Sequence, residues 1–190
     1  MSQDQVLTGG FAAPPQEAAR AFRAALEAMA RPGRVQVLTG TEPPEPLSVA
    51  AGTLLLTLCD TTTPVHLAPS HDSAAVRGWI AFHCGAPVVS AAEAAFAVGT
   101  WDALQPVSRF AIGTADYPDR SATLIVETEG MAPPNAVLRG PGIECSHPAR
   151  LPEIAAFVAN RAGFPLGFDC YFCAGSEVIG LPRSTLVEAL

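Results

Sequence analysis

The sequence contains no lysine, and all 11 of its basic residues are arginines. A Schiff base with pyridoxal phosphate, the phosphate-binding lysine of a Walker-type loop and a lysine general base all require a side-chain amine. Drift toward arginine in a GC-rich genome explains the absence without any functional reason. Whatever its cause, the absence excludes lysine-dependent chemistry, including an internal aldimine with pyridoxal phosphate.

Long apolar runs, an early basic residue and an excess of positive charge are also missing. No stretch approaches the ~18 apolar residues of a membrane span, and no basic residue precedes Arg20, so we expect neither a membrane anchor nor a signal peptide. The net charge of -7 disfavours nucleic acid and anionic membranes, because phosphate-rich surfaces select basic faces. These absences predict a cytoplasmic protein.

The length and composition indicate one domain, part of whose apolar surface is not buried in its own core. A chain of 190 residues is expected to bury roughly 70% of the surface that it exposes when unfolded. Its hydrophobic content of 49%, with 15% charged residues, exceeds that of a typical soluble domain. We therefore expect a single domain over residues 1–190, a loose lead-in over residues 1–10, and an apolar surface that meets another subunit.

The clearest structural signal is a hairpin in the last quarter of the chain. Residues 168–172 are apolar or aromatic apart from Asp169, which is typical of a strand covered on both faces. Gly175 can supply the positive φ of a turn over residues 174–176, and a second strand starts near Val178. We expect the rest of the chain to pack on this hairpin.

Strand and helix patterns alternate along the remaining sequence. Phe22, Ala25, Leu26 and Met29 recur at helical spacing and form one apolar stripe. Helices are predicted over residues 14–29, 47–58, 74–82 (with N-cap candidates over 70–73) and 152–161 (with Ile154, Phe157 and Val158 inward); strands over 34–38, 64–67, 96–98, 122–128 and 137–139; and a short helical segment over 101–104. By periodicity alone, the Leu-rich run within 47–58 could also be a buried strand. The interleaving favours an α/β fold, a three-layer α/β/α sandwich with a mixed sheet.

Cys170 and Cys173 form a C-x-x-C pattern that can indicate a redox pair. On a strand, however, residues at this spacing point to opposite faces with Cα atoms roughly 10 Å apart. A disulfide requires a separation below about 7 Å. We therefore predict two buried, unbridged thiols.

The histidines do not show a metal-binding pattern. His66, His71, His83 and His147, together with Asp72 and Cys84, contain neither an i, i+4 pair nor an H-E-x-x-H motif. We therefore expect no metal site, and a thiol or metal enzyme is the less favoured alternative.

Two arginines stand at the ends of predicted strands. Arg139 precedes Gly140, and Arg183 precedes Ser184 and Thr185, so Arg139, Arg183, Ser184 and Thr185 are candidates for an anion site or an interface. Alternatively, each guanidinium bonds carbonyls or carboxylates structurally. No G-x-S-x-G, P-loop or G-x-G-x-x-G motif occurs. A stand-alone protein that binds a small anion or a nucleotide therefore remains an alternative.

An ordered series of short motifs runs through nearly the whole chain. It begins with Phe11, Pro14 and Pro15, continues through Met29 and 32–33, and then includes 54–60, 63–65, 82–87, 122–125, 138–143, 164–169 and 181–185. In this order the motifs resemble the PhnH family, the H subunit of the bacterial carbon-phosphorus lyase core complex. No motif is decisive alone, but the ordered sum is specific.

The resemblance implies a role in phosphonate catabolism. In that pathway the G, H and I subunits, with the L protein, replace the adenine of ATP by a phosphonate to give a ribose 1-phosphonate 5-triphosphate, which the J subunit later cleaves. The family fold is similar to that of pyridoxal-phosphate-dependent transferases without the cofactor site. By this resemblance the chain is an accessory subunit of ribose 1-methylphosphonate 5-triphosphate synthase, with no catalytic or cofactor-binding residue carried over. We expect it to bind the G, I and J subunits and to form a homodimer when isolated.

Overall fold

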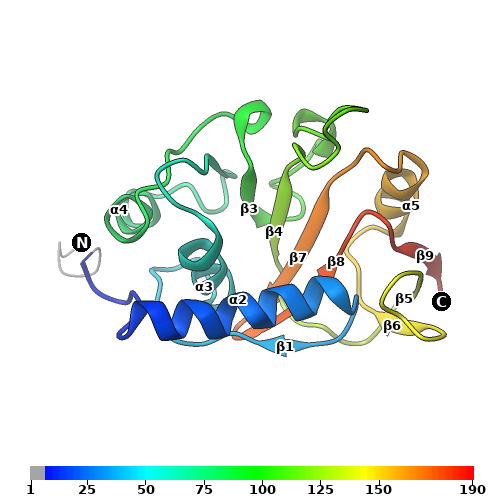
Figure 1. Ribbon diagram of the computed structural model, residues 1–190, viewed down its shortest axis with the longest axis horizontal. Helices are drawn as coiled ribbons and strands as arrows, with labels where there is room; N and C mark the ends of the chain where they lie inside the picture. The colour runs from blue at the N-terminus through cyan, green and yellow to red at the C-terminus, as the bar shows by residue number, and fades with distance from the viewer. Residues whose placement is uncertain (1–6) are drawn as a thin grey trace.

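The computed structural model describes residues 7–190, and a six-stranded mixed sheet lies at its centre (Figure 1). Its strand order is β1-β8-β7-β4-β3-β2, in which β2, β3, β4 and β7 run parallel and β8 is antiparallel to both of its neighbours, β7 and β1. These strands are β1 (Gln36–Val37), β2 (Val65–Leu67), β3 (Phe96–Thr100), β4 (Thr123–Glu127), β7 (Asp169–Ala174) and β8 (Glu177–Leu181). The predicted α/β class and mixed sheet are confirmed.

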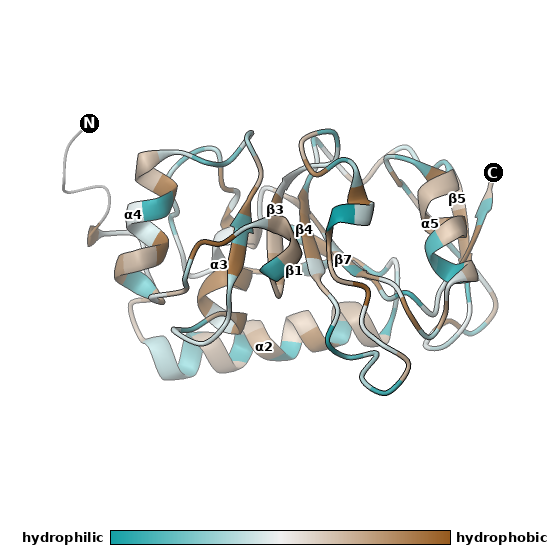
Figure 2. Cartoon of the chain, turned by 90° about the horizontal axis from the view of Figure 1, so that it is seen from above, coloured by the Kyte–Doolittle hydropathy of each residue, from teal (hydrophilic) through white to brown (hydrophobic). Residues whose placement is uncertain are grey.

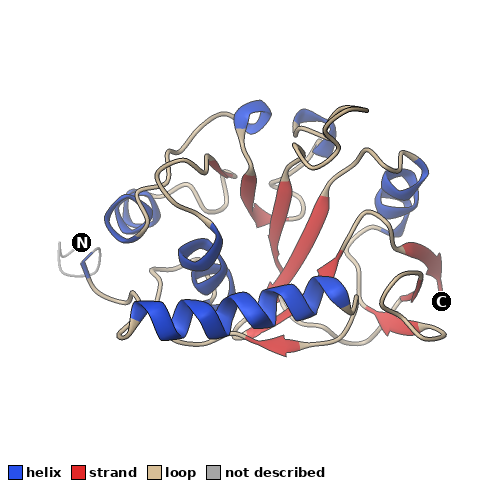
Figure 3. Ribbon diagram, in the orientation of Figure 1, coloured by secondary structure: helices blue, strands red, loops and turns tan. Residues whose placement is uncertain are grey.

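Helices and a second small sheet surround the central one (Figure 3). The helices are α2 (Pro14–Ala30), α3 (Val49–Leu58), α4 (Ala74–His83) and α5 (Ile154–Ala162), with short 3₁₀ helices η1 (Ala91–Glu93) and η2 (Val107–Arg109). The second sheet is antiparallel, in the order β6-β5-β9, and comprises β5 (Ala136–Arg139), β6 (His147–Ala149) and β9 (Leu186–Ala189).

The hairpin β7–β8 occupies the position that the sequence predicted. β7 lies between β4 and β8, and Gly175 turns the chain with a φ of +59°. The side chains of β7 alternate between two cores: Tyr171 and Cys173 pack on one face of the sheet, and Cys170 and Phe172 on the other. Residues of α2, α3 and α4 share the first core, whereas Phe157 of α5 and residues of the small sheet share the second.

Helix α2 buries its small residues and exposes large ones. Ala21, Ala25 and Ala28 face the core, while Phe22 is 53% exposed and Leu26 58% exposed. The reason is the close approach of α2 to β8, where a Cβ atom at position 180 would lie 2.6 Å from the backbone of Ala28. Only alanine-sized side chains fit between such close backbones, so of the predicted stripe only its alanine is buried.

Several other expectations need correction. Val158 of α5 was expected inward and is 47% exposed, and residues 101–104 form turns rather than a helical segment. The strands β6 and β9 had not been predicted. Figure 2 shows apolar colouring concentrated on α3 and the central strands, in accord with the burial of α3. The predicted lead-in falls mostly outside the described residues, and the carbonyl of Gly9 within it accepts a hydrogen bond from the Glu42 N–H at 2.8 Å.

Candidate functional site

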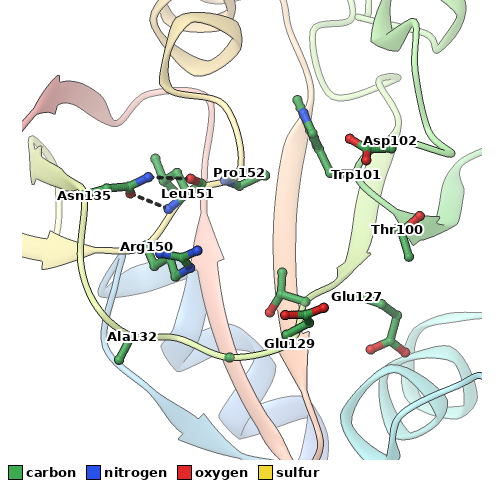
Figure 4. A pocket seen from close by; sticks show the side chains of 12 residues that line it. Thr100, Trp101, Asp102, Glu127, Glu129, Ala132, Asn135, Arg150, Leu151 and Pro152 are labelled. Atoms are coloured by element: carbon green, nitrogen blue, oxygen red, sulfur yellow. Dashed lines mark hydrogen bonds between the residues drawn. The ribbon is translucent and has the colours of Figure 1, made fainter.

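A cleft of about 760 Å³ opens at the carboxyl ends of the parallel strands β3 and β4 (Figure 4). Ligands of open α/β sheets bind in crevices at this edge, where strand ends and loops place polar groups around a common space. The cleft is lined by Thr100, Trp101, Asp102, Glu127, Thr128, Glu129, Gly130, Ala132, Asn135, Arg150, Leu151 and Pro152. A second cavity, of about 610 Å³ beside Thr8 and residues 42–45, is smaller.

The two sides of the cleft are held by hydrogen bonds within the chain. On one side Asn135 accepts from the Leu151 N–H at 2.8 Å and donates to the Leu151 carbonyl at 2.9 Å. On the other side the Trp101 indole donates to Glu153 at 3.0 Å. Figure 4 shows Glu129 between these sides. The walls are therefore formed by residues whose positions are fixed before any ligand arrives.

The described lining of the cleft is acidic. It holds three carboxylates, those of Asp102, Glu127 and Glu129, against one guanidinium, that of Arg150. Negative potential focused in a cleft repels anions and favours neutral or cationic molecules. The cleft is thus a poor candidate for binding a free phosphate or phosphonate.

Glu127 is the most buried of these carboxylates, and its side chain is 11% exposed. One of its oxygens, Oε1, accepts a hydrogen bond of 2.7 Å from the Ser48 N–H at the start of α3. Burial raises the pKa of Glu127, and the Ser48 hydrogen bond opposes that shift. The carboxylate therefore occupies the positive end of α3, where an anion is otherwise bound.

His71 lies against Glu127 in the turn that follows β2, and it is 2% exposed. Its Nε2 is 3.9 Å from Glu127 Oε1 and makes no hydrogen bond of normal geometry with any of residues 7–190. Its Nδ1 is 2.9 Å from the hydroxyl of Ser70. Burial lowers the pKa of His71, and the carbonyl of Pro46 partly offsets this effect. A buried imidazole is thus kept neutral beside a carboxylate.

Arg183, a candidate from the sequence, lies at the opposite end of the sheet and is fully engaged. Its backbone N–H and its Nε both donate to Asp169 Oδ1, at 2.8 and 3.1 Å, and its Nη2 donates to Oδ2 at 2.5 Å. The guanidinium also bonds the Pro118 carbonyl at 2.7 Å and the Ser121 hydroxyl. Each nitrogen of this side chain has a partner, and four of its five N–H groups are used, so the guanidinium is committed mainly to contacts within the chain.

The other three sequence candidates lie near the second sheet. Arg139 forms an exposed contact of 3.4 Å with Glu188 and donates to the Cys145 carbonyl at 3.3 Å. Ser184 lies in the turn after β8. Thr185 is 2% exposed, and its hydroxyl has no hydrogen-bond partner within the described chain. Gly140 lies against the backbone of Ser184 and Thr185, but Arg139 and Arg183 bond different partners and share none of them.

The cysteines of β7 are buried core residues, and the described residues form no metal-binding cluster. Cys170 and Cys173 are free and pack in cores on opposite faces of the sheet, which confirms their predicted arrangement. Burial raises the pKa of both thiols well above the usual value. Among residues 7–190 no group of three or more His, Cys, Asp and Glu side chains is placed to hold a metal ion.

Sequence reasoning did not predict that Ser70, His71 and Glu127 lie together. The first two were treated only as N-cap or metal candidates, whereas the N-cap of α4 is Ser73. A signal was present, because Ser70, Thr100 and Glu127 stand at the carboxyl ends of three predicted strands. In a parallel sheet these ends converge at one edge.

The chain, an α/β protein by its fold, matches a known protein family over most of its length. Residues 9–188 match the family model described as bacterial phosphonate metabolism protein (PhnH). The chain belongs to this family.

Two curated relatives extend the match over full length. The chain is 41% identical, over 98% of both sequences, to the alpha-D-ribose 1-methylphosphonate 5-triphosphate synthase subunit PhnH of Rhizobium meliloti (strain 1021). It is 31% identical to the putative C-P lyase subunit protein HtxG of Stutzerimonas stutzeri, over 94% of this chain and 95% of that protein. Within the described residues, no helix is long and apolar enough to cross a membrane.

Proposed function

We propose that this chain is an accessory subunit of a carbon-phosphorus lyase assembly, required for the synthesis of alpha-D-ribose 1-methylphosphonate 5-triphosphate in phosphonate catabolism. The observation that carries the proposal is the 41% identity over 98% of both chains to a subunit of that synthase. In this proposal residues 1–190 form a single domain of that family. The proposed setting is the cytoplasm.

The exposed face of α2 supports a role within an assembly. Phe22 and Leu26 are both more than half exposed, and they adjoin Met29 on the same helix face. Met29 also lines a groove of about 280 Å³ together with Leu58 and Phe96. An apolar surface of this kind on a soluble subunit marks a contact with another protein. In our proposal the G, I and J subunits are the partners, and a second copy covers this surface in the isolated protein.

In this proposal the four candidate residues from the sequence, Arg139, Arg183, Ser184 and Thr185, have structural or interface roles. Arg183 fixes the start of β7 to the loop that ends at Ser121, with Ser184 and Thr185 completing the turn beside it. Arg139 ends the central strand of the second sheet, and its half-exposed side chain is available for a subunit contact. The proposed fold relation is to pyridoxal-phosphate-dependent transferases without the cofactor site, and the lack of lysine supports the lack of an aldimine.

The test is co-purification from cells that express the chain with the G, I and J subunits, combined with growth on a phosphonate as phosphorus source. We expect a stable complex and loss of growth when this chain is deleted. Phe22→Asp with Leu26→Asp should abolish co-purification and shift the isolated protein from dimer to monomer in light scattering. The matched control is Val158→Asp, which alters an equally exposed apolar residue of α5 and should change neither result. Full growth and a full synthase activity without this chain would contradict the proposal.

A further inference from the structure

The Ser70 hydroxyl makes two hydrogen bonds. Its oxygen accepts from the Thr100 N–H at 3.1 Å, and the same hydroxyl is 2.9 Å from His71 Nδ1. A hydroxyl oxygen can accept two hydrogen bonds and donate one, so the tautomer of His71 decides whether Ser70 donates its proton to Nδ1. Ser70 is exposed, and Thr100, its backbone partner, lines the cleft.

The surroundings of His71 Nε2 favour one tautomer of the imidazole. The Glu127 carboxylate, whose Oε1 is 3.9 Å from Nε2, is an acceptor. It attracts a protonated Nε2 and repels an unprotonated one. The tautomer with its proton on Nε2 is therefore favoured, and in it the lone pair of Nδ1 faces the Ser70 hydroxyl.

We infer that Ser70, His71 and Glu127 form a nucleophile, a general base and a positioning carboxylate for acyl transfer at the rim of the cleft. Serine is activated in this way when a base accepts its proton and a third group orients the base, whatever the order in the sequence. This inference does not depend on the proposed role as an accessory subunit. A subunit of an assembly can carry a separate hydrolytic site.

The acidic cleft determines the substrate class. With three carboxylates and one guanidinium in the described lining, a neutral or cationic ester is accepted and an anionic ester is repelled. The site thus acts on carboxylic esters rather than on nucleotides or free phosphonates.

The reaction is balanced with water as the co-reactant. Ser70 Oγ forms a bond to the ester carbonyl carbon while its proton passes to His71 Nδ1. The bond from that carbon to the alkoxy oxygen then breaks, and the alcohol leaves with the proton from Nδ1. Water, deprotonated by the same nitrogen, hydrolyses the acyl-serine, which releases the carboxylic acid and restores the Ser70 hydroxyl.

The test treats the purified full-length protein with a neutral alkyl fluorophosphonate, followed by mass spectrometry of peptides. Ser70 Oγ should displace fluoride from phosphorus, so that the adduct maps to Ser70 in the unaltered protein. The Ser70→Ala variant should lose the adduct. The matched control is Ser90→Ala, because Ser90 is also exposed and its hydroxyl bonds a carboxylate, that of Glu93, at 2.6 Å without an imidazole. It should label as the unaltered protein does.

Two further variants test the base and the positioning residue. His71→Asn keeps an acceptor near the Nδ1 position and should slow labelling by about 100-fold or more, as expected for loss of a general base. Glu127→Gln should slow labelling and shift its pH profile to lower pH, because the imidazolium loses the facing carboxylate, whereas a merely structural role would leave the profile in place. Neutral p-nitrophenyl acetate should be hydrolysed faster than an anionic p-nitrophenyl ester.

An adduct elsewhere than Ser70 would overturn the inference, as would no adduct at all. Equal labelling in the folded His71→Asn variant would do the same. Failure of the co-purification test would leave this site intact, and failure of the labelling test would leave the subunit role intact, so the two proposals are separable.

Discussion

Two acid–base pairs with largely buried side chains lie at opposite ends of the strand pair β4 and β7. They differ in how completely their polar groups are hydrogen-bonded. Asp169 begins β7 opposite Thr123, and Glu127 ends β4 opposite Cys173. Asp169 pairs with Arg183 through several hydrogen bonds, and every nitrogen of that guanidinium is used. Glu127 faces His71 at 3.9 Å, and the facing nitrogen has no hydrogen bond of normal geometry in the described chain.

The difference follows from the chemistry of the two basic side chains. A guanidinium is always charged and has five N–H donors, so its burial is favourable only when partners replace most of the water, as four hydrogen bonds do for Arg183. An imidazole can remain neutral, which lets it stay buried with one nitrogen weakly paired and the other held to Ser70. The first pair fixes structure, whereas the second retains the capacity to accept a proton.

The largest expected effect is the loss of stability when the Asp169–Arg183 pair is broken. Arg183→Ala should lower the free energy of unfolding by about 3 kcal/mol, because it leaves the partly buried Asp169 carboxylate without its partner. Arg183→Lys should recover little of this, since an ammonium cannot make the bidentate contact. Urea denaturation measures the change.

The control for this prediction is Arg139→Ala. Its ion pair with Glu188 is about half exposed on both sides, and such pairs contribute below about 1 kcal/mol. If Arg183→Ala and Arg139→Ala lowered the free energy of unfolding equally, the Asp169–Arg183 pair would be no different from an ordinary surface contact.

A smaller effect is expected at Glu127. Glu127→Ala should cost about 1–2 kcal/mol, because the Ser48 N–H at the start of α3 loses its acceptor. Glu127→Gln keeps an acceptor oxygen at the same place and should remain close to the unaltered protein. If both variants were equally unstable, the charge rather than the hydrogen bond would be what holds α3.

The smallest effect is a change in how stability depends on pH. The pKa of His71 is lowered by burial, so the unfolded chain binds a proton more readily than the folded one. Stability should therefore fall as pH falls below about 6.5, the pKa of an unperturbed histidine. His71→Asn should flatten this part of the profile of melting temperature against pH, and an unchanged slope would contradict the assignment.

The hairpin could be predicted because it depends on local signals. A nearly continuous apolar run indicates a strand that is buried on both faces, and Gly175 indicates the turn, whichever elements pack around them. The orientation of α2 could not be predicted in this way. It depends on the close approach of α2 to Gly180, which lies far away in the sequence. The small sheet could not be predicted either, because β6 has only three residues and one of them is Pro148, which leaves no strand pattern in the sequence.

The candidate site could be predicted in part from the sequence. Strand ends at residues 67, 100 and 127 suggest that Ser70, Thr100 and Glu127 share an edge once the strands are known to be parallel neighbours. The burial of Glu127 and His71 depends on α3, because the N–H of its N-cap residue Ser48 hydrogen-bonds the Glu127 carboxylate. No local pattern encodes that contact.

The most direct test of the central claim, that His71 is a neutral base directed at Ser70, is the nitrogen NMR spectrum of its imidazole at neutral pH. The signal is assigned by its loss in His71→Asn. The account predicts a neutral ring with the proton on Nε2 and an unprotonated Nδ1 that accepts from Ser70. A ring that is protonated on Nδ1, or a doubly protonated imidazolium, would contradict it.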